Sequence, residues 1–298
     1  MAVLTDRHPV RLTPHLDHPS GTLYVVATPI GNLADSSPRS IEVLRAADIV
    51  ACEDTRTSRT LLAHHGIAAR TVALHAHNER EAGAKLLRTL REGGSVALVS
   101  DAGTPGISDP GALLVAAAHR EGLRVVPLPG PNAAVAAYSA AGFASSRFLF
   151  AGFLPAGSKK ARSSCLDGLD VPWPVILYEA PHRVLETVEA LLARFGPERE
   201  LVIAREVSKK FEEIARLTLA AAPGWLAAGP HRQQGEFVLV LGPGEEKRAA
   251  LAAGERIVKI LLEKMPASDA AKLAARITGL PRNALYRVAL ERTAGGTK

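Results

Sequence analysis

The sequence predicts an α/β protein of two domains followed by a small all-helical domain. Between residues 21 and 145, short β-branched runs alternate with helix-like segments, which is typical of a largely parallel sheet covered by helices. A second series of apolar runs, with an amphipathic helix, occupies residues 146–244. From residue 247 to residue 298, Ala, Leu, Lys and Arg recur at helical spacing without a strand signal. Residues 1–20 contain no apolar segment and are expected to form a disordered extension.

Four apolar runs are the expected strands of the first domain, and each ends in a loop rich in turn residues. The runs begin at Leu23, Ile49, Val96 and Leu123. Loops that follow parallel strands open on one crevice of the sheet, where ligands bind. Residues 100–106 (Ser-Asp-Ala-Gly-Thr-Pro-Gly) are also compatible with a plain turn. Three similar loops on the same edge favour a wall of backbone and small side chains that suits a flat adenosine.

The second domain is expected to carry charged residues where two of its strands end. Residues 178–183 (Tyr-Glu-Ala-Pro-His-Arg) place an aromatic ring, an acid, an imidazole and a guanidinium within six positions. His182 alone is more typical of a polar helix start. Further charges after the next strand, at residues 205–206 and 209–210, favour a functional cluster. The expected strands are Phe148–Phe153, Val175–Tyr178, Leu201–Ala204, Arg216–Leu219 and Phe237–Leu241, and the expected helix is Val184–Phe195.

Composition excludes several classes of protein. The 298 residues are 47% hydrophobic and 22% charged, which is typical of a folded globular protein and unlike a disordered chain. The longest apolar stretches are shorter than the roughly 20 residues that cross a bilayer. Two cysteines make no disulfide framework, so a cytoplasmic location is expected.

Two motif types are missing or incomplete. No Gly-x-Gly-x-x-Gly follows the first strand, which disfavours an ordinary dinucleotide-binding fold. His75, His77, Asn78 and Glu79 resemble metal ligands by residue type but lack a tetrahedral set at workable spacing. No metal site is therefore expected.

The C-terminal segment concentrates the positive charge of the chain. Residues 247–298 hold eleven Lys and Arg against four Asp and Glu, whereas the whole chain has a net charge of +6. Ser268 is expected to cap one helix, residues 279–281 (Gly-Leu-Pro) to end it, and residues 282–291 to form a second helix. This helix-turn-helix pattern is either an RNA-binding domain or a basic, solvated cap on the second domain. The second helix is expected to place Leu285, Val288 and Ala289 on one face and Asn283 and Arg287 on the other.

Six motifs occur together in one order along the chain. They are Thr28–Asp35 (TPIGNLAD), Glu53–Arg56 (EDTR), Ser100–Gly111 (SDAGTPGISDPG), Pro129–Ala133 (PGPNA), Glu179–Arg183 (EAPHR) and Gly235–Phe237 (GEF). The set resembles the signature of the bacterial ribosomal RNA small subunit methyltransferase I family, which is part of the tetrapyrrole methylase superfamily. The resemblance extends over residues 21–244, and six motifs in register are far more specific than any one of them.

The resemblance implies both a fold and an activity. Two α/β domains of tetrapyrrole methylase type would hold S-adenosylmethionine in the cleft between them, and the protein would be a homodimer. The reaction would be 2′-O-methylation of a cytidine ribose in 16S ribosomal RNA, with the RNA presented in the small ribosomal subunit.

Candidate site residues follow from the resemblance and the motifs. Cofactor contacts are expected at Pro29, Asp101, Ala102, Gly103, Thr104, Asn132, Ala133 and Tyr178. A ribose hydroxyl is a poor nucleophile, so a base or a neighbouring cation should assist it by roughly a hundredfold to ten-thousandfold. The candidates for that role, unranked, are Glu179, His182, Arg183, Glu206 and Lys210. RNA contacts are expected at Arg56, Arg282, Asn283 and Arg287.

Two other functions are compatible with the same residues. One is a tetrapyrrole methyltransferase of the same fold, and the other is a non-catalytic RNA-binding assembly factor. A small macrocycle has no need of a basic helical tail, which argues against the first. The intact loop at Asp101 and the motif at residues 179–183 argue against the second.

Overall fold

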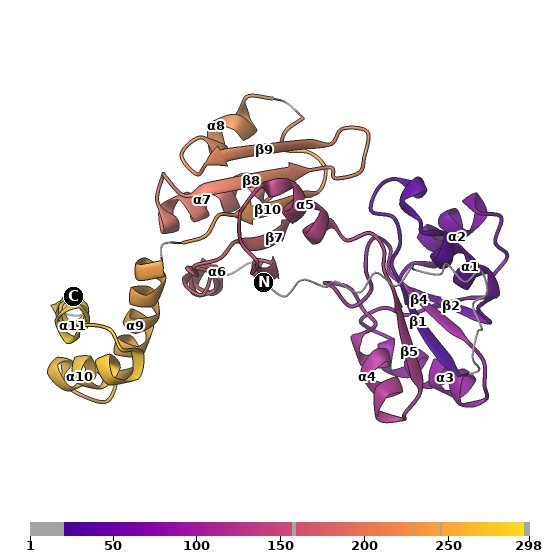
Figure 1. Ribbon diagram of the computed structural model, residues 1–298, viewed down its shortest axis with the longest axis horizontal. Helices are drawn as coiled ribbons and strands as arrows, with labels where there is room; N and C mark the ends of the chain where they lie inside the picture. The colour runs from indigo at the N-terminus through magenta and orange to yellow at the C-terminus, as the bar shows by residue number, and fades with distance from the viewer. Residues whose placement is uncertain (1–20, 157–158, 230, 245, 295–298) are drawn as a thin grey trace, which may run out of the picture. The chain divides into compact units, whose positions relative to one another are not determined.

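The computed structural model describes residues 21–156, 159–229, 231–244 and 246–294 (Figure 1). The expected extension at residues 1–20 lies outside the described residues. The chain divides into two compact units. Among the described residues, the first unit contains residues 21–29 and Leu33–Pro131, and the second contains Ile30–Asn32 and the described residues that follow Pro131.

The first unit is built on a five-stranded sheet in which every neighbouring pair is parallel. The strand order is β3-β2-β4-β1-β5. The four strands expected from the sequence are confirmed, and the structure adds β3, a three-residue edge strand too short for a recognisable apolar run. The strands are β1 (Thr22–Val26), β2 (Ile49–Cys52), β3 (Thr71–Ala73), β4 (Val96–Val99) and β5 (Arg124–Leu128).

Helices cover both faces of this sheet, as its continuously buried strands require. Helices α1 (Pro38–Ala46) and α2 (Thr55–His64) pack on one face. Helices α3 (Glu79–Arg91) and α4 (Ala112–Arg120) pack on the other. A short 3-10 turn, η1 (Leu33–Asp35), precedes α1. All the strands therefore send their carboxyl ends, and the loops that follow them, to one edge.

The second unit contains a mixed sheet of order β6-β7-β10-β8-β9. Strands β6 and β7 are parallel, and the other neighbours are antiparallel. The edge strand β9 begins at Glu213, three residues before the expected start at Arg216. The strands are β6 (Leu149–Phe153), β7 (Val175–Glu179), β8 (Glu200–Arg205), β9 (Glu213–Thr218) and β10 (Phe237–Leu241).

Helices α5 to α8 accompany this sheet, and α5 belongs to the second unit although the sequence placed it in the first domain. Helix α5 (Ala133–Ala141) packs through its alanines against Ile176, Val202 and Val240 on one face. The second unit therefore begins at Asn132, earlier than the expected boundary at 145/146. The other helices are α6 (Lys159–Asp167), α7 (Val184–Phe195), which matches the expected helix, and α8 (Ala222–Ala227).

Three C-terminal helices pack on one another: α9 (Glu246–Leu262), α10 (Ala267–Thr278) and α11 (Arg282–Ala294). Gly279, in the left-handed conformation, ends α10 as expected. The expected cap at Ser268 is wrong, because α10 already begins at Ala267 after Pro266 and no side chain caps it. The shared core consists of Val258, Ala271, Ala274, Leu285 and Ala289.

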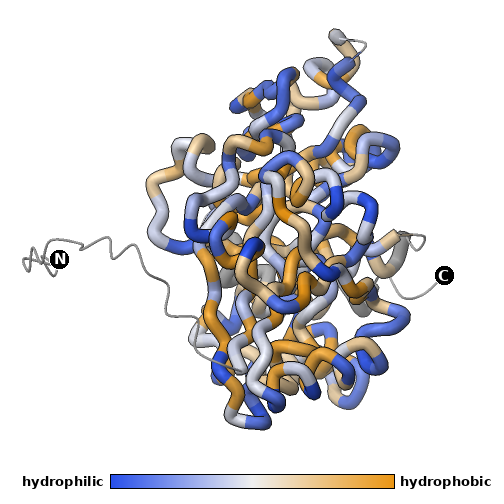
Figure 2. Tube along the Cα trace, turned by 90° about the vertical axis from the view of Figure 1, so that its right-hand side faces the viewer, coloured by the Kyte–Doolittle hydropathy of each residue, from blue (hydrophilic) through white to orange (hydrophobic). Residues whose placement is uncertain are grey.

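No helix among the described residues is both long enough and apolar enough to span a bilayer. Along the Cα trace, apolar stretches are short and interrupted by hydrophilic residues (Figure 2).

Candidate functional site

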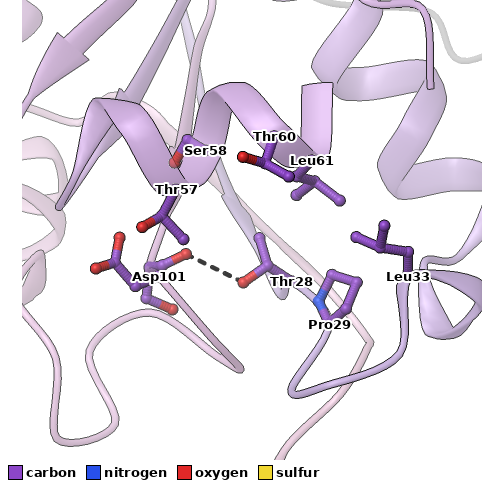
Figure 3. A pocket seen from close by; sticks show the side chains of 9 residues that line it. Thr28, Pro29, Leu33, Thr57, Ser58, Thr60, Leu61 and Asp101 are labelled. Atoms are coloured by element: carbon purple, nitrogen blue, oxygen red, sulfur yellow. Dashed lines mark hydrogen bonds between the residues drawn. The ribbon is translucent and has the colours of Figure 1, made fainter. Parts of the chain in front are cut away.

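Backbone hydrogen bonds join the loops after β1 and β4 in the first unit. Thr28 N–H donates to the Gly103 carbonyl at 2.8 Å, and Gly103 N–H donates to the Thr28 carbonyl at 3.0 Å. The Thr28 hydroxyl donates to the Ser100 carbonyl at 3.1 Å (Figure 3). Gly103 has a φ of +83°, a conformation that a residue with a Cβ rarely adopts. The two expected cofactor loops are thus held as one piece.

The loop after β5 is tied to the same edge. The Thr104 hydroxyl donates to the Pro131 carbonyl at 3.0 Å. Gly130 lies so close to Ala27 that an added Cβ would be 2.8 Å from the Ala27 Cβ. Three of the four expected loops therefore form a rigid, backbone-rich edge.

A cavity of about 300 Å³ opens between the loop after β1 and helix α2. This volume is at the lower end of the range for small-molecule sites. Its two ends differ, because Asp101 lies at one end and the apolar side chain of Leu33 at the other (Figure 3). Most of the polar groups between them are hydroxyls. The lining residues are Thr28, Pro29, Leu33, Thr57, Ser58, Thr60, Leu61, Ser100 and Asp101.

Asp101 is fixed by the start of α2. Its Oδ1 accepts a hydrogen bond from Asp54 N–H at 3.0 Å. Asp54 in turn caps α2 by accepting from Arg56 N–H at 2.7 Å, and the hydrogen bonds from Arg56 lower the pKa of Asp54 to about 2.

Two further carboxyl groups, those of Glu53 and Asp109, interact electrostatically with Asp101. Burial raises the pKa of Asp109 to about 6, and the charges of Glu53 and Asp101 add to this effect. Burial and the charge of Asp101 also raise the pKa of Glu53. Burial is thus the main cause of both shifts, and the charges of neighbouring carboxyl groups are a smaller one.

The residues that resemble metal ligands serve the loops instead. The Asn78 side chain accepts from His75 N–H at 2.8 Å. Glu79 caps α4, since its Oε1 accepts from Gly111 N–H at 3.0 Å and from Leu113 N–H at 2.9 Å. In the part of the chain that the structure describes, no group of three or more His, Cys, Asp or Glu residues could hold a metal ion.

In the second unit, Glu179 is buried and both of its carboxylate oxygens are engaged. Thr187 donates to Oε2 at 2.6 Å, and Ala180 N–H donates to Oε1 at 2.8 Å. Arg183 Nε lies 3.2 Å from Oε1, and its NH2 donates to the Leu154 carbonyl at 2.7 Å. Glu179 therefore stabilises the turn before α7. Because both of its oxygens are engaged, it is a poor proton acceptor for a substrate.

A second cluster of charges follows β8. Lys209 Nζ lies 3.0 Å from Glu206 Oε1 and 3.0 Å from Glu236 Oε2, and Glu236 N–H donates to Glu206 Oε1 at 2.9 Å. Burial opposes the charge of Glu206, but the hydrogen bonds from Glu236 and Lys209 outweigh it and lower the pKa of Glu206. Likewise, burial opposes the charge of Lys209, but the two carboxylates raise its pKa. Glu206 and Lys209 are therefore both held in their charged forms.

The backbone that builds this cluster is unusual. Glu206 and Ser208 have φ values of +52° and +68°, which are rare for residues with a Cβ and are concentrated at functional sites. The buried Arg205 guanidinium pins the loops on both sides, since Nε donates to the Gln234 carbonyl at 2.9 Å and NH1 to the Phe211 carbonyl at 2.8 Å.

Comparisons with known proteins identify the family. The model of the tetrapyrrole (corrin/porphyrin) methylases matches residues 22–223, and the model of the RsmI C-terminal HTH domain matches residues 248–293. The ribosomal RNA small subunit methyltransferase I of Pseudomonas aeruginosa is 50% identical, over 92% of this chain and 98% of that protein. That of Escherichia coli O157:H7 is 46% identical, over 92% of this chain and 96% of that protein.

The chain belongs to the ribosomal RNA small subunit methyltransferase I family.

Solved structures confirm the fold of the family's two α/β units. Uroporphyrin-III-C-methyltransferase from Thermus thermophilus is 23% identical with a TM-score of 0.53, over 74% of this chain and 94% of that chain. A diphthine synthase is 17% identical with a TM-score of 0.58, over 74% of this chain and 90% of that chain. At these identities the likeness concerns the fold alone.

The structure places the residues expected to bind the cofactor of this methyltransferase family in two groups. Pro29, Asp101 and residues 102–104 lie on the loop edge of the first unit. In the second unit, Asn132 caps α5 by accepting from Val135 N–H at 3.1 Å, and Ala134 N–H donates to the Tyr178 hydroxyl at 3.3 Å. Asn132, Ala133 and Tyr178 thus gather at the start of α5.

The candidates for catalysis and RNA binding separate in a similar way. His182 and Lys210 are exposed, and Lys210 lies 5.4 Å from the Phe211 ring centroid. Lys210 was the catalytic candidate from the sequence, but the adjacent Lys209 is the residue that forms ion pairs with Glu206 and Glu236. Arg56 is exposed and paired with Asp54. Arg282, Asn283 and Arg287 are all exposed on α11.

Proposed function

We propose that the protein transfers a methyl group from S-adenosylmethionine to the 2′-hydroxyl of a cytidine ribose in 16S ribosomal RNA. Methylation of small-subunit ribosomal RNA is the activity of the family to which the chain belongs. The observation that supports the cofactor assignment is the loop edge, where hydrogen bonds join the loops after β1 and β4 and Asp54 N–H fixes the Asp101 carboxylate. The ligand that such an edge favours is a cation with a flat adenosine, and S-adenosylmethionine is one.

The residues present fit this cofactor. The carboxylate of Asp101, with Glu53 and Asp109 behind it, would balance the sulfonium charge. Of residues 102–104 only Ala102 is exposed, and these three residues are the proposed contacts of the adenosine, with Pro29 at its border. On the second unit, the proposed contacts are Asn132, Ala133 and Tyr178. When bound, the cofactor supplies an electrophilic methyl group.

The chain's own contribution to the reaction is to position the ribose and favour its alkoxide. In-line displacement at a methyl group needs the hydroxyl held in line and shielded from water. We assign the group that favours the alkoxide to Lys209: two carboxylates fix its ammonium and take two of its three N–H donors, which leaves the third for the ribose oxygen. Glu206 and Glu236 hold that lysine in place.

The cofactor assignment is tested by calorimetry on the purified protein. Wild type should bind S-adenosylmethionine, and Asp101→Ala should bind it more weakly because the sulfonium loses its counter-charge. Glu42→Ala, which removes an exposed carboxylate from α1, is the matched control and should bind as wild type does. Failure of the folded wild type to bind contradicts the assignment.

The product is tested by its chemistry. Small-subunit ribosomal RNA from cells lacking the gene is incubated with enzyme and cofactor, either naked or in assembled subunits. A ribose ether blocks alkaline cleavage at the methylated linkage, so that linkage should survive alkali. A methylated site that still cleaves in alkali contradicts 2′-O-methylation.

We also propose that the assembled small subunit is the preferred substrate, that the enzyme is a cytoplasmic homodimer, and that the C-terminal helices bind the RNA. Light scattering measures the oligomer, and the comparison of naked and assembled RNA above measures the substrate preference. Removal of residues 247–298 should weaken RNA binding and flatten its salt dependence while leaving cofactor affinity unchanged.

A further inference from the structure

Helix α11 carries apolar residues on two faces, although only one of them is covered. Leu285 and Ala289 are fully buried in the core of the three C-terminal helices. A surface helix that packs on one face is normally polar on the other. Here Tyr286 is 37% exposed and Leu290 is 45% exposed.

These exposed residues form one stripe with polar neighbours. Asn283, Tyr286, Arg287 and Leu290 follow the i, i+3, i+4, i+7 spacing of a single helix face, and all four are exposed. Arg282 begins the same helix, with its guanidinium 3.2 Å from the Ser268 hydroxyl. The stripe therefore presents an aromatic ring between an amide and a guanidinium.

The charge around the stripe points to a polyanion. Lys272, Arg276, Arg282 and Arg287 are all exposed on α10 and α11. A planar aromatic group among cations is the combination with which proteins hold unpaired nucleotides, because the ring stacks on a base while the cations meet phosphates.

The form of the nucleic acid follows from groove geometry. The second helix of a helix-turn-helix reads duplex DNA by entering the major groove. The major groove of A-form RNA is too deep and narrow for side chains to read. On an RNA substrate, α11 therefore has to meet bases that are already splayed out of a duplex.

We propose that Tyr286 is a stacking platform for an unpaired RNA base, with Arg287 and Arg282 on the adjacent phosphates. The surface then selects a single-stranded or looped segment over a duplex. This inference deepens the RNA-binding role assigned to the C-terminal helices and rests on it.

The test uses the full-length protein and two labelled probes, a 12-nucleotide oligouridylate and a 12-base-pair RNA duplex. Tyr286→Ala should weaken binding of the single strand by about 5- to 150-fold, the range for loss of one base–aromatic stack. Its salt slope should stay unchanged because no charge is lost. Tyr286→Phe should retain wild-type affinity, and duplex binding should change in neither variant.

Two controls separate stacking from other effects. Arg287→Ala should lower the salt slope by about 0.7, the value for one phosphate contact on a single strand. Ile260→Ala removes an apolar side chain, 63% exposed on α9, and should leave RNA affinity unchanged. Tyr286→Gln should repeat the Tyr286→Ala result, and unchanged duplex binding by both variants excludes a folding defect.

Several outcomes overturn the proposal. They are wild-type affinity in Tyr286→Ala, equal losses on both probes, and a Phe variant as weak as the Ala variant. Unchanged RNA affinity with weaker binding to RNA-free ribosomal proteins would instead assign the surface to a protein. Base stacking without any methylation by the wild type would overturn the proposed function and leave this inference intact.

Discussion

The two α/β units place opposite electrostatic environments at their strand ends. In the first unit, the carboxyl groups of Glu53, Asp101 and Asp109 lie near one another, and burial and mutual repulsion raise the pKa values of Glu53 and Asp109. In the second unit, Lys209 lies between Glu206 and Glu236, and the pKa of Glu206 is lowered. Acidic residues after the strands therefore lie in two different environments: several carboxyl groups lie together in the first unit, whereas two carboxylates hold one ammonium in the second.

The largest expected effect concerns the buried pair of the second unit. Glu179→Ala leaves the Arg183 guanidinium without its partner in a region where Glu179 is 2% exposed. Removal of one partner of a buried ion pair costs about 3 to 5 kcal/mol of unfolding free energy. Urea unfolding measures this loss. Glu189→Ala, on the exposed side of α7, is the control and should leave the midpoint unchanged; equal midpoints for both variants would refute the buried role.

The next effect separates two adjacent lysines. Lys209→Met removes the fixed cation and should lower kcat for methyl transfer by about a hundredfold, the loss typical of one stabilising group. Lys210→Met removes an equal charge from an exposed position and should leave kcat unchanged. Single-turnover methylation of small-subunit RNA distinguishes them, and equal losses in both variants would show that only net charge matters.

The third effect is a stability gain in the first unit. The pKa of Asp109 is raised from 3.8 to about 6, so its contribution to stability is present below about pH 4 and lost as the pH rises through 6. Asp109→Asn should therefore raise the unfolding free energy at pH 7 by about 1 to 2 kcal/mol, allowing for the part of the carboxyl that stays solvated.

The pH dependence of this gain provides its check. Urea unfolding at pH 4 should show no difference between Asp109→Asn and wild type, and a difference that is constant with pH would contradict the buried, repelled carboxyl. The pKa shift of Glu206 has the opposite sign to that of Asp109, and so does the pH dependence of its contribution to stability. Its pKa is lowered, so its contribution is present at neutral pH and is lost as the pH falls through the folded pKa.

The smallest effect tests the RNA contact expected in the first unit. Arg56→Ala should reduce the salt slope of RNA binding by about 0.7 to 0.9, the value for one phosphate. Arg59→Ala, an exposed arginine on the same helix, is the matched control. Identical slopes for the two variants would mean that α2 contributes only diffuse charge.

Local sequence signals predicted one unit better than the other. The strands of the first sheet are apolar runs bounded by Gly, Pro and Asp, so they and their loops could be read directly, apart from the short β3. Helix α5 was assigned to the wrong side of the domain boundary because its alanines fit either sheet. Only the contacts with Ile176 and Val202 decide its place.

The sequence predicted which charged residues follow β8 but not which of them pair with one another. Lys209 and Lys210 are the same residue type at neighbouring positions, and the positive φ values of Glu206 and Ser208 determine which one meets the carboxylates. Glu179 was one of the candidates for the group that assists the ribose hydroxyl, because its motif combines an aromatic ring, an acid, an imidazole and a guanidinium. Its partner Thr187, eight residues later on α7, shows that the carboxylate is already used.

The contact between Gly130 and Ala27 limits how the loop edge can change during evolution. The two positions together have room for one methyl group, since a Cβ on Gly130 would lie 2.8 Å from the Ala27 Cβ but 3.4 Å from the nearest backbone atom of that residue. An alanine at position 130 therefore requires a glycine at position 27. A chain with alanine at both positions would have to separate the loops that follow β1 and β5. We therefore expect substitutions at positions 27 and 130 to occur together, although neither residue needs to contact a ligand.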